Sequence, residues 1–288
     1  MTKEIILLTG GFVLCFIIFG LVERRWPAHP ARPLTREFWT TDVLHFFISS
    51  TIYKFAVIFI MARIAGLVTY PDAIEAIRSS IGAQPLWLQF IEVVIVSDFV
   101  QYWMHRWAHE IPFLWRIHSV HHSSEHMDWV ASARAHPVDQ IIRRVATLFV
   151  LLVLGMSETT FYIYWFIFAP LHSFFIHANF GKRIPFIRYI ITTPEYHHWH
   201  HVMYPVDKNY SGRFPLFYWM FATYHIPNAE KSSTYGCHEK VHRGYLAQLL
   251  HPFRQAEPIE PHDTLPGDSA KLGAETAPAA DLSKGSLR

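Results

Sequence analysis

The chain alternates between long apolar stretches and short polar segments. Ile5–Val22 is an uncharged run of the length that crosses the hydrocarbon core of a bilayer, for which a helix needs about 20 residues. Further apolar runs lie within Leu44–Leu67, about Leu86–Met104 and Thr159–Ala178. Val145–Ser157 is uncharged but short, so it either spans or forms half of a re-entrant hairpin with the next run. The pattern predicts an all-α, polytopic membrane protein with about four to five spans.

Charged residues and proline refine this prediction. Basic residues and Trp26 follow the first run, where a cleaved signal peptide would need small residues, so we expect an uncleaved helix. Lys54 and Arg63 interrupt the second run on opposite helix faces and would extend toward opposite membrane interfaces. Pro170 predicts a kink in the last run.

Arginine and lysine gather in alternate loops, which predicts the orientation. Basic residues follow the first, third and last runs, whereas the loop before the third run has only Arg78 beside Asp72 and Glu75. We therefore expect the N-terminus outside and a histidine-rich helical cap on the cytoplasmic side. In a bacterial cell this would be the inner membrane.

Composition agrees with a membrane protein. Hydrophobic residues make up 51% of the 288, and the net charge of +2 motivates no nucleic-acid partner. Two distant cysteines give no disulfide framework. From about Gln255 the chain is rich in Pro, Ala, Gly and Ser, which is typical of disorder. We expect N-terminal transmembrane helices over 1–85, a catalytic region over 86–254 and a disordered cytoplasmic tail over 255–288.

Spaced histidines are the candidate chemistry. One HxxxH motif and two HxxHH motifs repeat helical spacings, so each cluster should present its rings to one point. Imidazole is the commonest metal ligand, and eight rings exceed the four ligands of a tetrahedral zinc, which favours two metal ions. The eight are His105, His109, His118, His121, His122, His197, His200 and His201.

Neutral histidines bring no charge to a metal site, so nearby carboxylates should balance the metals and orient the rings. Asp98 lies seven residues before His105, on nearly the same helix face, and is the first candidate for this orienting role. Asp128, Asp139 and Glu195 are further candidates.

Six segments of the chain contain these residues or lie between them. The segments are Asp98-Phe-Val-Gln-Tyr-Trp-Met-His105-Arg-Trp-Ala-His109, Trp115-Arg-Ile-His118-Ser-Val-His121-His122-Ser-Ser, Arg134-Ala-His136-Pro137, His177-Ala-Asn179, Thr193-Pro-Glu-Tyr-His197-His-Trp-His200-His201 and Asp207-Lys-Asn-Tyr-Ser-Gly212. Together they resemble the fatty acid hydroxylase superfamily, in particular its sterol desaturases and alkylglycerol monooxygenase-like proteins. The resemblance covers roughly residues 90–225 and keeps the order and spacing of the motifs.

The resemblance implies an integral membrane, O2-dependent enzyme whose histidines hold two iron ions, with O2 as co-substrate. The eight spaced histidines would be ligands, and His177 and His172 would be further ones, whereas His136 belongs to a His-Pro feature that does not imply ligation. In the family a Leu-Trp-Asp sequence often follows the Asn-Tyr-Gly segment. Here Ser211 is inserted before Gly212 and that aspartate is missing.

These observations predict a di-iron enzyme that hydroxylates or desaturates a fatty acyl, sterol-like or ether lipid taken from the bilayer. No dinucleotide fingerprint or cysteine cluster is present, so electrons should come from a separate redox donor. A membrane zinc hydrolase and a metal-ion transporter are the alternatives. The first would carry a general-base motif such as HExxH, and the second would place its ligands near the membrane midplane.

Overall fold

The computed structural model describes residues 3–29, 36–203, 207–227 and 234–254. In these residues the regular elements are helices, with one isolated antiparallel bridge between Val202 and Tyr235. Every helix below belongs to one compact unit, drawn from the described residues up to Cys237 and from Val241–Arg254, and residues 238–240 are not part of it. The all-α prediction is confirmed. The predicted tail lies outside the described residues, and the division at residue 85 stays a prediction.

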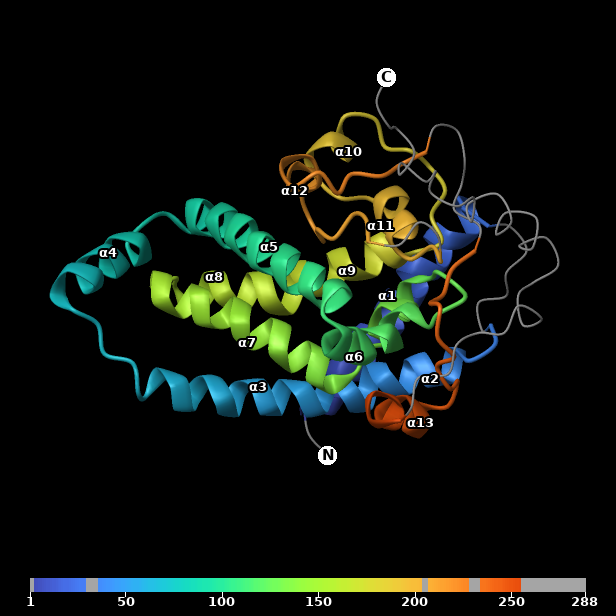
Figure 1. Ribbon diagram of the computed structural model, residues 1–288. Coiled ribbons are helices and arrows are strands. Elements are labelled where there is room, and N and C mark those ends of the chain that lie inside the picture. The colour runs from blue at the N-terminus through green and yellow to red at the C-terminus, as the bar shows by residue number, and fades with distance from the viewer. Residues whose placement is uncertain (1–2, 30–35, 204–206, 228–233, 255–288) are drawn as a thin grey trace, which may run out of the picture. The chain divides into compact units, whose positions relative to one another are not determined.

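Long helices run beside one another and end near the histidines. Figure 1 shows α3, α5, α7 and the α8–α9 segment side by side, and α3 contacts α7, which contacts α5. The C-terminal ends of α5 and α9 and the N-terminal ends of α3 and α7 lie at the same end of the unit (Figure 1). The long elements are α1 (Lys3–Arg25), α3 (Ser50–Ala65), α5 (Leu86–Glu110), α7 (Pro137–Leu154) and α8 (Glu158–Tyr162) followed by η3 (Ile163–Phe168) and α9 (Ala169–His177).

Short helices complete the unit, and proline begins several of them. Pro112, Pro137, Pro194 and Pro215 each occupy the first helical turn, where the missing backbone N–H costs nothing and the fixed φ favours a helix. The short elements are α2 (Trp39–Leu44), η1 (His45–Ser49), α4 (Asp72–Gly82), α6 (Pro112–His122), η2 (Trp129–Ala133), α10 (Ile187–Ile190), α11 (Pro194–His200), α12 (Pro215–Met220), α13 (Tyr245–Leu250) and η4 (His251–Phe253).

Three helical segments are long and apolar enough to cross a membrane: Ile5–Arg25, Trp39–Ala65 and Glu158–His177. α4 and α5 together make a fourth if the pair, bent by 115°, counts as one span. The protein is therefore an integral membrane protein. Val145–Ser157 falls mostly within α7, which is not among these candidate spans because its first turns carry charged residues.

The helix that contains Pro170 is irregular just before the proline. η3 is a π-helix, a wider turn in which each N–H bonds five residues back, and Pro170 follows it on α9. Proline has no N–H to continue an α-helical ladder, and a local change of helix type is one way to accommodate it. The predicted kink itself stays a prediction. The π segment carries Tyr164 and Trp165, whose rings lie beside arginines described below.

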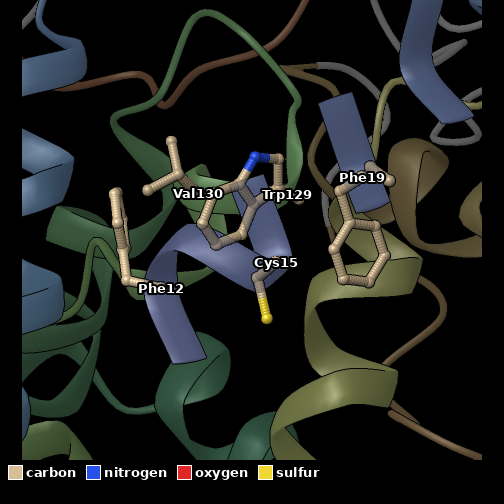
Figure 2. Close-up of a cluster of buried hydrophobic side chains, with 6 residues drawn as sticks. Phe12, Cys15, Phe19, Trp129 and Val130 are labelled. Atoms are coloured by element: carbon tan, nitrogen blue, oxygen red, sulfur yellow. The ribbon is translucent and has the colours of Figure 1, made fainter. Parts of the chain in front are cut away.

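One face of α1 is packed against the protein rather than left for lipid. Phe12, Cys15 and Phe19 pack against Trp129 of η2 and against α9, as Figure 2 shows for the η2 side. At the end of α1, Glu23 Oε1 accepts hydrogen bonds from the backbone N–H of Trp129 (2.9 Å) and from the backbone N–H of Asn179 (3.0 Å). The first predicted span is thereby fixed to the segments that lead into the histidine region.

Candidate metal centre

The structure brings nine histidines into two groups. The first histidine group is His105 and His109 of α5, His118 and His122 of α6, and His200 of α11. The second histidine group is His121 of α6, His177 of α9, His197 of α11 and His201, which follows it. Within each group one nitrogen of every ring lies within 4.8 Å of the others. All but His109 are buried.

Each HxxHH motif divides between the two groups. His121 joins the second group while His122 joins the first, and His200 and His201 divide in the same way. For the two HxxHH motifs the expectation that each cluster points to one place is therefore wrong, because consecutive helical residues point about 100° apart, whereas His105 and His109 of the HxxxH motif do lie in one group. The two groups touch, since the rings of His122 and His201 stack with centroids 4.4 Å apart. The arrangement is two adjacent sites rather than three separate clusters.

Backbone carbonyls determine which ring nitrogen faces each site. A carbonyl oxygen can only accept, so a ring nitrogen bonded to it must carry the proton, and the other nitrogen of the neutral ring keeps a free lone pair. Four histidines donate in this way through Nδ1. The pairs are His105 with Tyr210 (2.7 Å), His121 with Arg134 (2.9 Å), His177 with Ser173 (2.7 Å) and His200 with Lys208 (2.7 Å).

The opposite nitrogens of these rings converge. Nε2 of His177 lies 3.3 Å from Nε2 of His121 and 3.0 Å from Nε2 of His197. In the first group the Nε2 atoms of His105 and His118 are 3.0 Å apart. His121 and His177 both donate through Nδ1, so their Nε2 lone pairs face each other and cannot form a hydrogen bond between neutral rings. A metal cation bound between such nitrogens removes that repulsion, and the donor set fits two metal ions.

Burial keeps the rings in the neutral form that binds metal. Burial, followed by repulsion from His177, lowers the pKa of His121 to about 3. The same cause lowers the pKa of five further histidines well below the usual value, with neighbouring charges adding to the effect. These are His118, His122, His197, His200 and His201.

Two carboxylates approach the outer nitrogens of the first group. Asp139 Oδ2 lies 3.5 Å from Nδ1 of His118, and Asp207 Oδ1 lies 3.3 Å from Nδ1 of His109. Asp139 is one of the carboxylates that the sequence suggested. Asp207 was missed, although it begins a segment that resembles the family, because only the fold shows that it reaches α5.

Asp98 contacts the backbone of a turn beside the histidine groups and not a histidine ring. Its carboxylate accepts hydrogen bonds from the backbone N–H of Gly212 (3.1 Å), Arg213 (3.0 Å) and Phe214 (2.7 Å). Its hydrogen bonds in the described structure include none to a histidine. The turn that it holds directly follows Tyr210, whose carbonyl oxygen orients His105. Asp98 therefore contacts the segment that carries the partner of His105, one step further from the histidine groups than its spacing suggested.

The inserted serine takes part in the same turn. Ser211 Oγ donates to Asp98 Oδ2 at 2.5 Å, and the Ser211 carbonyl accepts a hydrogen bond from the hydroxyl of Tyr218. The inserted serine, which departs from the family pattern, thus lies in the same turn whose N–H groups bind the Asp98 carboxylate.

The other predicted residues lie outside the two groups. His172 belongs to neither, and its ring stacks on Phe168 with centroids 5.7 Å apart. It precedes His177 by five residues, a spacing that directs the two side chains to different faces of α9. His136 accepts the N–H of Val138 at the start of α7, which agrees with a role other than ligation. Glu195 pairs with two arginines, Arg183 and Arg188.

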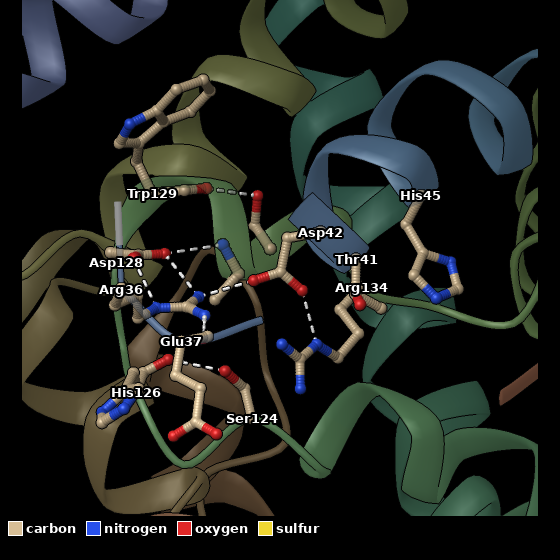
Figure 3. Close-up of polar contacts among 12 residues, drawn as sticks. Arg36, Glu37, Thr41, Asp42, His45, Ser124, His126, Asp128, Trp129 and Arg134 are labelled. Atoms are coloured by element: carbon tan, nitrogen blue, oxygen red, sulfur yellow. Dashed lines mark hydrogen bonds and ion pairs between the residues drawn. The ribbon is translucent and has the colours of Figure 1, made fainter. Parts of the chain in front are cut away.

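Asp128, the remaining candidate carboxylate, belongs to a buried ion-pair network that sequence reasoning missed. Arg36 donates to Asp42 (2.6 Å) and to Asp128 (2.7 Å), and Arg134 donates to the other oxygen of Asp42 (2.5 Å), as Figure 3 shows. Because the Arg134 carbonyl also orients His121, the network fixes one wall of the second histidine group.

A cavity of about 450 Å³ joins the membrane helices to both histidine groups. His105 of the first group and His121, His177 and His197 of the second line its polar end. Its apolar wall includes side chains of α1, η3 and α9 that are also exposed on the surface of candidate spans. These are Leu7, Leu14, Phe166, Ile167 and Leu171. The cavity can therefore receive an apolar molecule from the lipid side and bring it to the histidines.

The histidine-bearing region matches known proteins. Residues 90–223, which contain both histidine groups, match the fatty acid hydroxylase family. The chain is 30% identical to the ornithine lipid hydroxylase OlsE of Rhizobium tropici over 171 residues, which are 59% of this chain and 51% of the relative. No solved structure matches the chain.

A human and a plant protein are further relatives. The human alkylglycerol monooxygenase is 30% identical over 57% of this chain and 33% of its own length. Methylsterol monooxygenase 2-2 of Arabidopsis thaliana is 28% identical over 47% of this chain and 52% of its own length. The chain thus spans about half or less of these relatives. The residues that build both histidine groups thus lie in the part of the chain that is similar to the fatty acid hydroxylase family.

Proposed function

We propose that the protein is a membrane-bound, O2-dependent oxidoreductase that hydroxylates or desaturates a lipid at a di-iron centre. The observation that carries this is the pair of histidine groups whose Nε2 atoms converge at the inner end of a cavity lined by membrane helices. The three relatives named above are a hydroxylase and two monooxygenases, and their names specify lipid substrates. Fatty acyl, sterol-like and ether lipids all fit an apolar cavity of this kind.

Each part of the site has a defined task. The first and second histidine groups would each hold one iron, and bound iron supplies the one-electron and O2 chemistry that attack on an unactivated C–H bond requires. Backbone carbonyls fix the rings through Nδ1, so the ligand geometry is set before substrate binds. The apolar wall holds the lipid chain against this end and excludes water from it.

The reducing electrons would come from a separate donor, because the sequence contains no dinucleotide fingerprint and no cysteine cluster. The loop charges favour a cytoplasmic position for the histidine groups, which would place the site within reach of a cytosolic or membrane-bound reductase.

Metal analysis of anaerobically purified protein, joined to a turnover assay, tests the proposal. We expect two irons per chain, and a lipid product that incorporates label from isotopic O2. His121→Ala and His200→Ala should each lose metal and turnover, whereas His242→Ala, at an exposed position, should change neither. Full lipid turnover without O2 would instead indicate a hydrolase, and a single tightly bound metal in fully active protein would contradict the di-iron centre.

A further inference from the structure

The charges along the cavity are all of one sign. Lys54, Arg143, Arg144 and Arg213 line it, and no aspartate or glutamate is among the described residues of its wall. An apolar lipid tail needs none of these cations. Charged groups in a partly enclosed cavity are costly unless a group of opposite charge pairs with them.

Among the described residues, carboxylates pair with two of these four cations. Arg143 forms an ion pair with Asp139 at 2.5 Å, and the guanidinium of Arg213 lies 3.8 Å from Asp98. The ion pairs of the described residues include neither Arg144 nor Lys54. These two side chains therefore leave net positive charge facing the cavity.

Arg144 is held inside the cavity instead of extending to a membrane surface. Its guanidinium lies 4.4 Å from the ring centroid of Tyr53 on α3 and 4.9 Å from that of Trp165 on η3. Its Nε donates to Gln140 Oε1 at 3.1 Å. Ring stacking and this bond orient the planar group, while its two terminal nitrogens make no hydrogen bond to another described residue. A fixed guanidinium with unused N–H donors matches a carboxylate or phosphate oxygen pair.

A second arginine of the cavity, Arg213, also has its guanidinium over an aromatic ring. Arg213 lies over the ring of Tyr164 at 5.3 Å. Tyr164 and Trp165 are consecutive residues of the π-helix η3, so the irregular segment before Pro170 places one ring under each of two arginines. π segments often occur at functional sites, and this one shapes the cationic part of the cavity.

We propose that Arg144 and Lys54 bind an anionic head group of the lipid substrate, a phosphate or a carboxylate, while its chain lies along the apolar wall toward the histidines. This inference rests on the proposed function and specifies its substrate class. An uncharged lipid of the same chain length should bind more weakly, because it leaves both cations without a partner.

Binding of three probes to the full-length protein in nanodiscs of uncharged lipid tests the proposal. The probes are a lysophosphatidate, a fatty acid and a monoacylglycerol with the same acyl chain. At least one anionic probe should bind about tenfold tighter than the monoacylglycerol, since a charge-assisted contact contributes about 1.5–3 kcal/mol and 1.4 kcal/mol is tenfold. This preference should shrink at high ionic strength. Comparison of the two anionic probes distinguishes phosphate from carboxylate.

Charge-removing and charge-preserving variants make the test specific. Arg144→Gln and Lys54→Gln should each lose most of the preference, and Arg144→Lys should keep much of it. Arg63→Gln, at an exposed position on the same helix as Lys54, should leave it unchanged. The melting temperature checks folding of each variant, and Lys54→Gln carries the test if Arg144→Gln does not fold.

Several results would overturn the inference. Equal binding of neutral and anionic probes would do so, as would a preference that survives in both charge-removing variants. Displacement of the lysophosphatidate by the same concentration of inorganic phosphate would assign the cations to a free anion. The assay requires no turnover, so selective binding by a protein that oxidises no lipid would contradict the proposed function alone. Equal oxidation of charged and neutral lipids, with equal binding, would contradict only this inference.

Discussion

At the scale of single residues, the environment of each ring decides whether a histidine can bind metal. His177 and His172 lie on the same short helix, and the sequence suggested both as ligands. His177 donates through Nδ1 to the Ser173 carbonyl and directs Nε2 at other Nε2 atoms, whereas His172 faces Phe168 and the cavity. The spacing of five residues places the two rings on different faces of α9, but which face meets the other histidines depends on where the neighbouring helices pack.

This difference gives a prediction for metal content. His177→Gln should lower the metal bound to the second histidine group, because it removes one of four converging nitrogens. His172→Gln should retain both metals and change substrate binding instead, because His172 lines the cavity outside both groups. Elemental analysis of the two purified variants, beside the unaltered protein, checks this. Loss of a metal from His172→Gln would show that it is a ligand after all.

Asp98→Asn should weaken the site without emptying it. The substitution replaces one acceptor oxygen by an NH2 group, which cannot accept the N–H groups of the 211–214 turn. The Tyr210 carbonyl that orients His105 should then be less well fixed. We expect metal to be retained at least in part and activity to fall about 10–100-fold, as for other residues that orient metal ligands. Asp72→Asn, at an exposed position on α4, is the control. Unchanged activity and metal content would limit Asp98 to a purely structural role.

At the scale of helices, local pattern predicted most of what the structure shows. Apolar runs predicted the three candidate spans, and the spaced histidines predicted the helices that carry the two histidine groups, because both patterns depend on residues within a few turns of one another. The division of His121 from His122, and the carbonyl partners of the rings, depend on contacts between distant segments. The π-helix and the ion-pair network were not predicted from the sequence either. In the network, Arg36 pairs with Asp128, which lies 92 positions away in the chain.

The ion-pair network leads to a prediction for the element that it holds. Asp42→Asn should leave Arg36 and Arg134 with weakened pairing in a buried setting, and breaking a buried pair costs about 3–5 kcal/mol. The Arg134 carbonyl would also lose its fixed position beside His121, so the second histidine group should bind metal less tightly.

Thermal melting with metal titration measures both effects. Glu110→Gln, which breaks an exposed pair with Arg106, should change neither by a comparable amount. A variant that melts earlier but binds metal normally would separate the network from the metal centre and leave it a role in stability only.

At the scale of the whole unit, helix direction bears on membrane topology. α7 begins at the histidine end beside α13 and ends at Leu154, where Arg78 of α4 donates to the Val153 carbonyl at 3.0 Å. It therefore runs the length of the neighbouring α8–α9 span in the opposite direction (Figure 1). If α8–α9 crosses the membrane, the turn that joins it to α7 lies at the far side from the histidines.

This arrangement predicts the accessibility of two positions. Glu158→Cys, at the exposed start of α8, should react with a membrane-impermeant thiol reagent in intact cells, because the loop charges place this end outside. His242→Cys, exposed near α13 and the histidine end, should react only after permeabilisation. The native cysteines are buried and give a low background. Protection of Glu158→Cys under both conditions would mean that α7 and α8 form a re-entrant hairpin. Labelling of His242→Cys in intact cells would instead reverse the orientation and place the histidine groups outside.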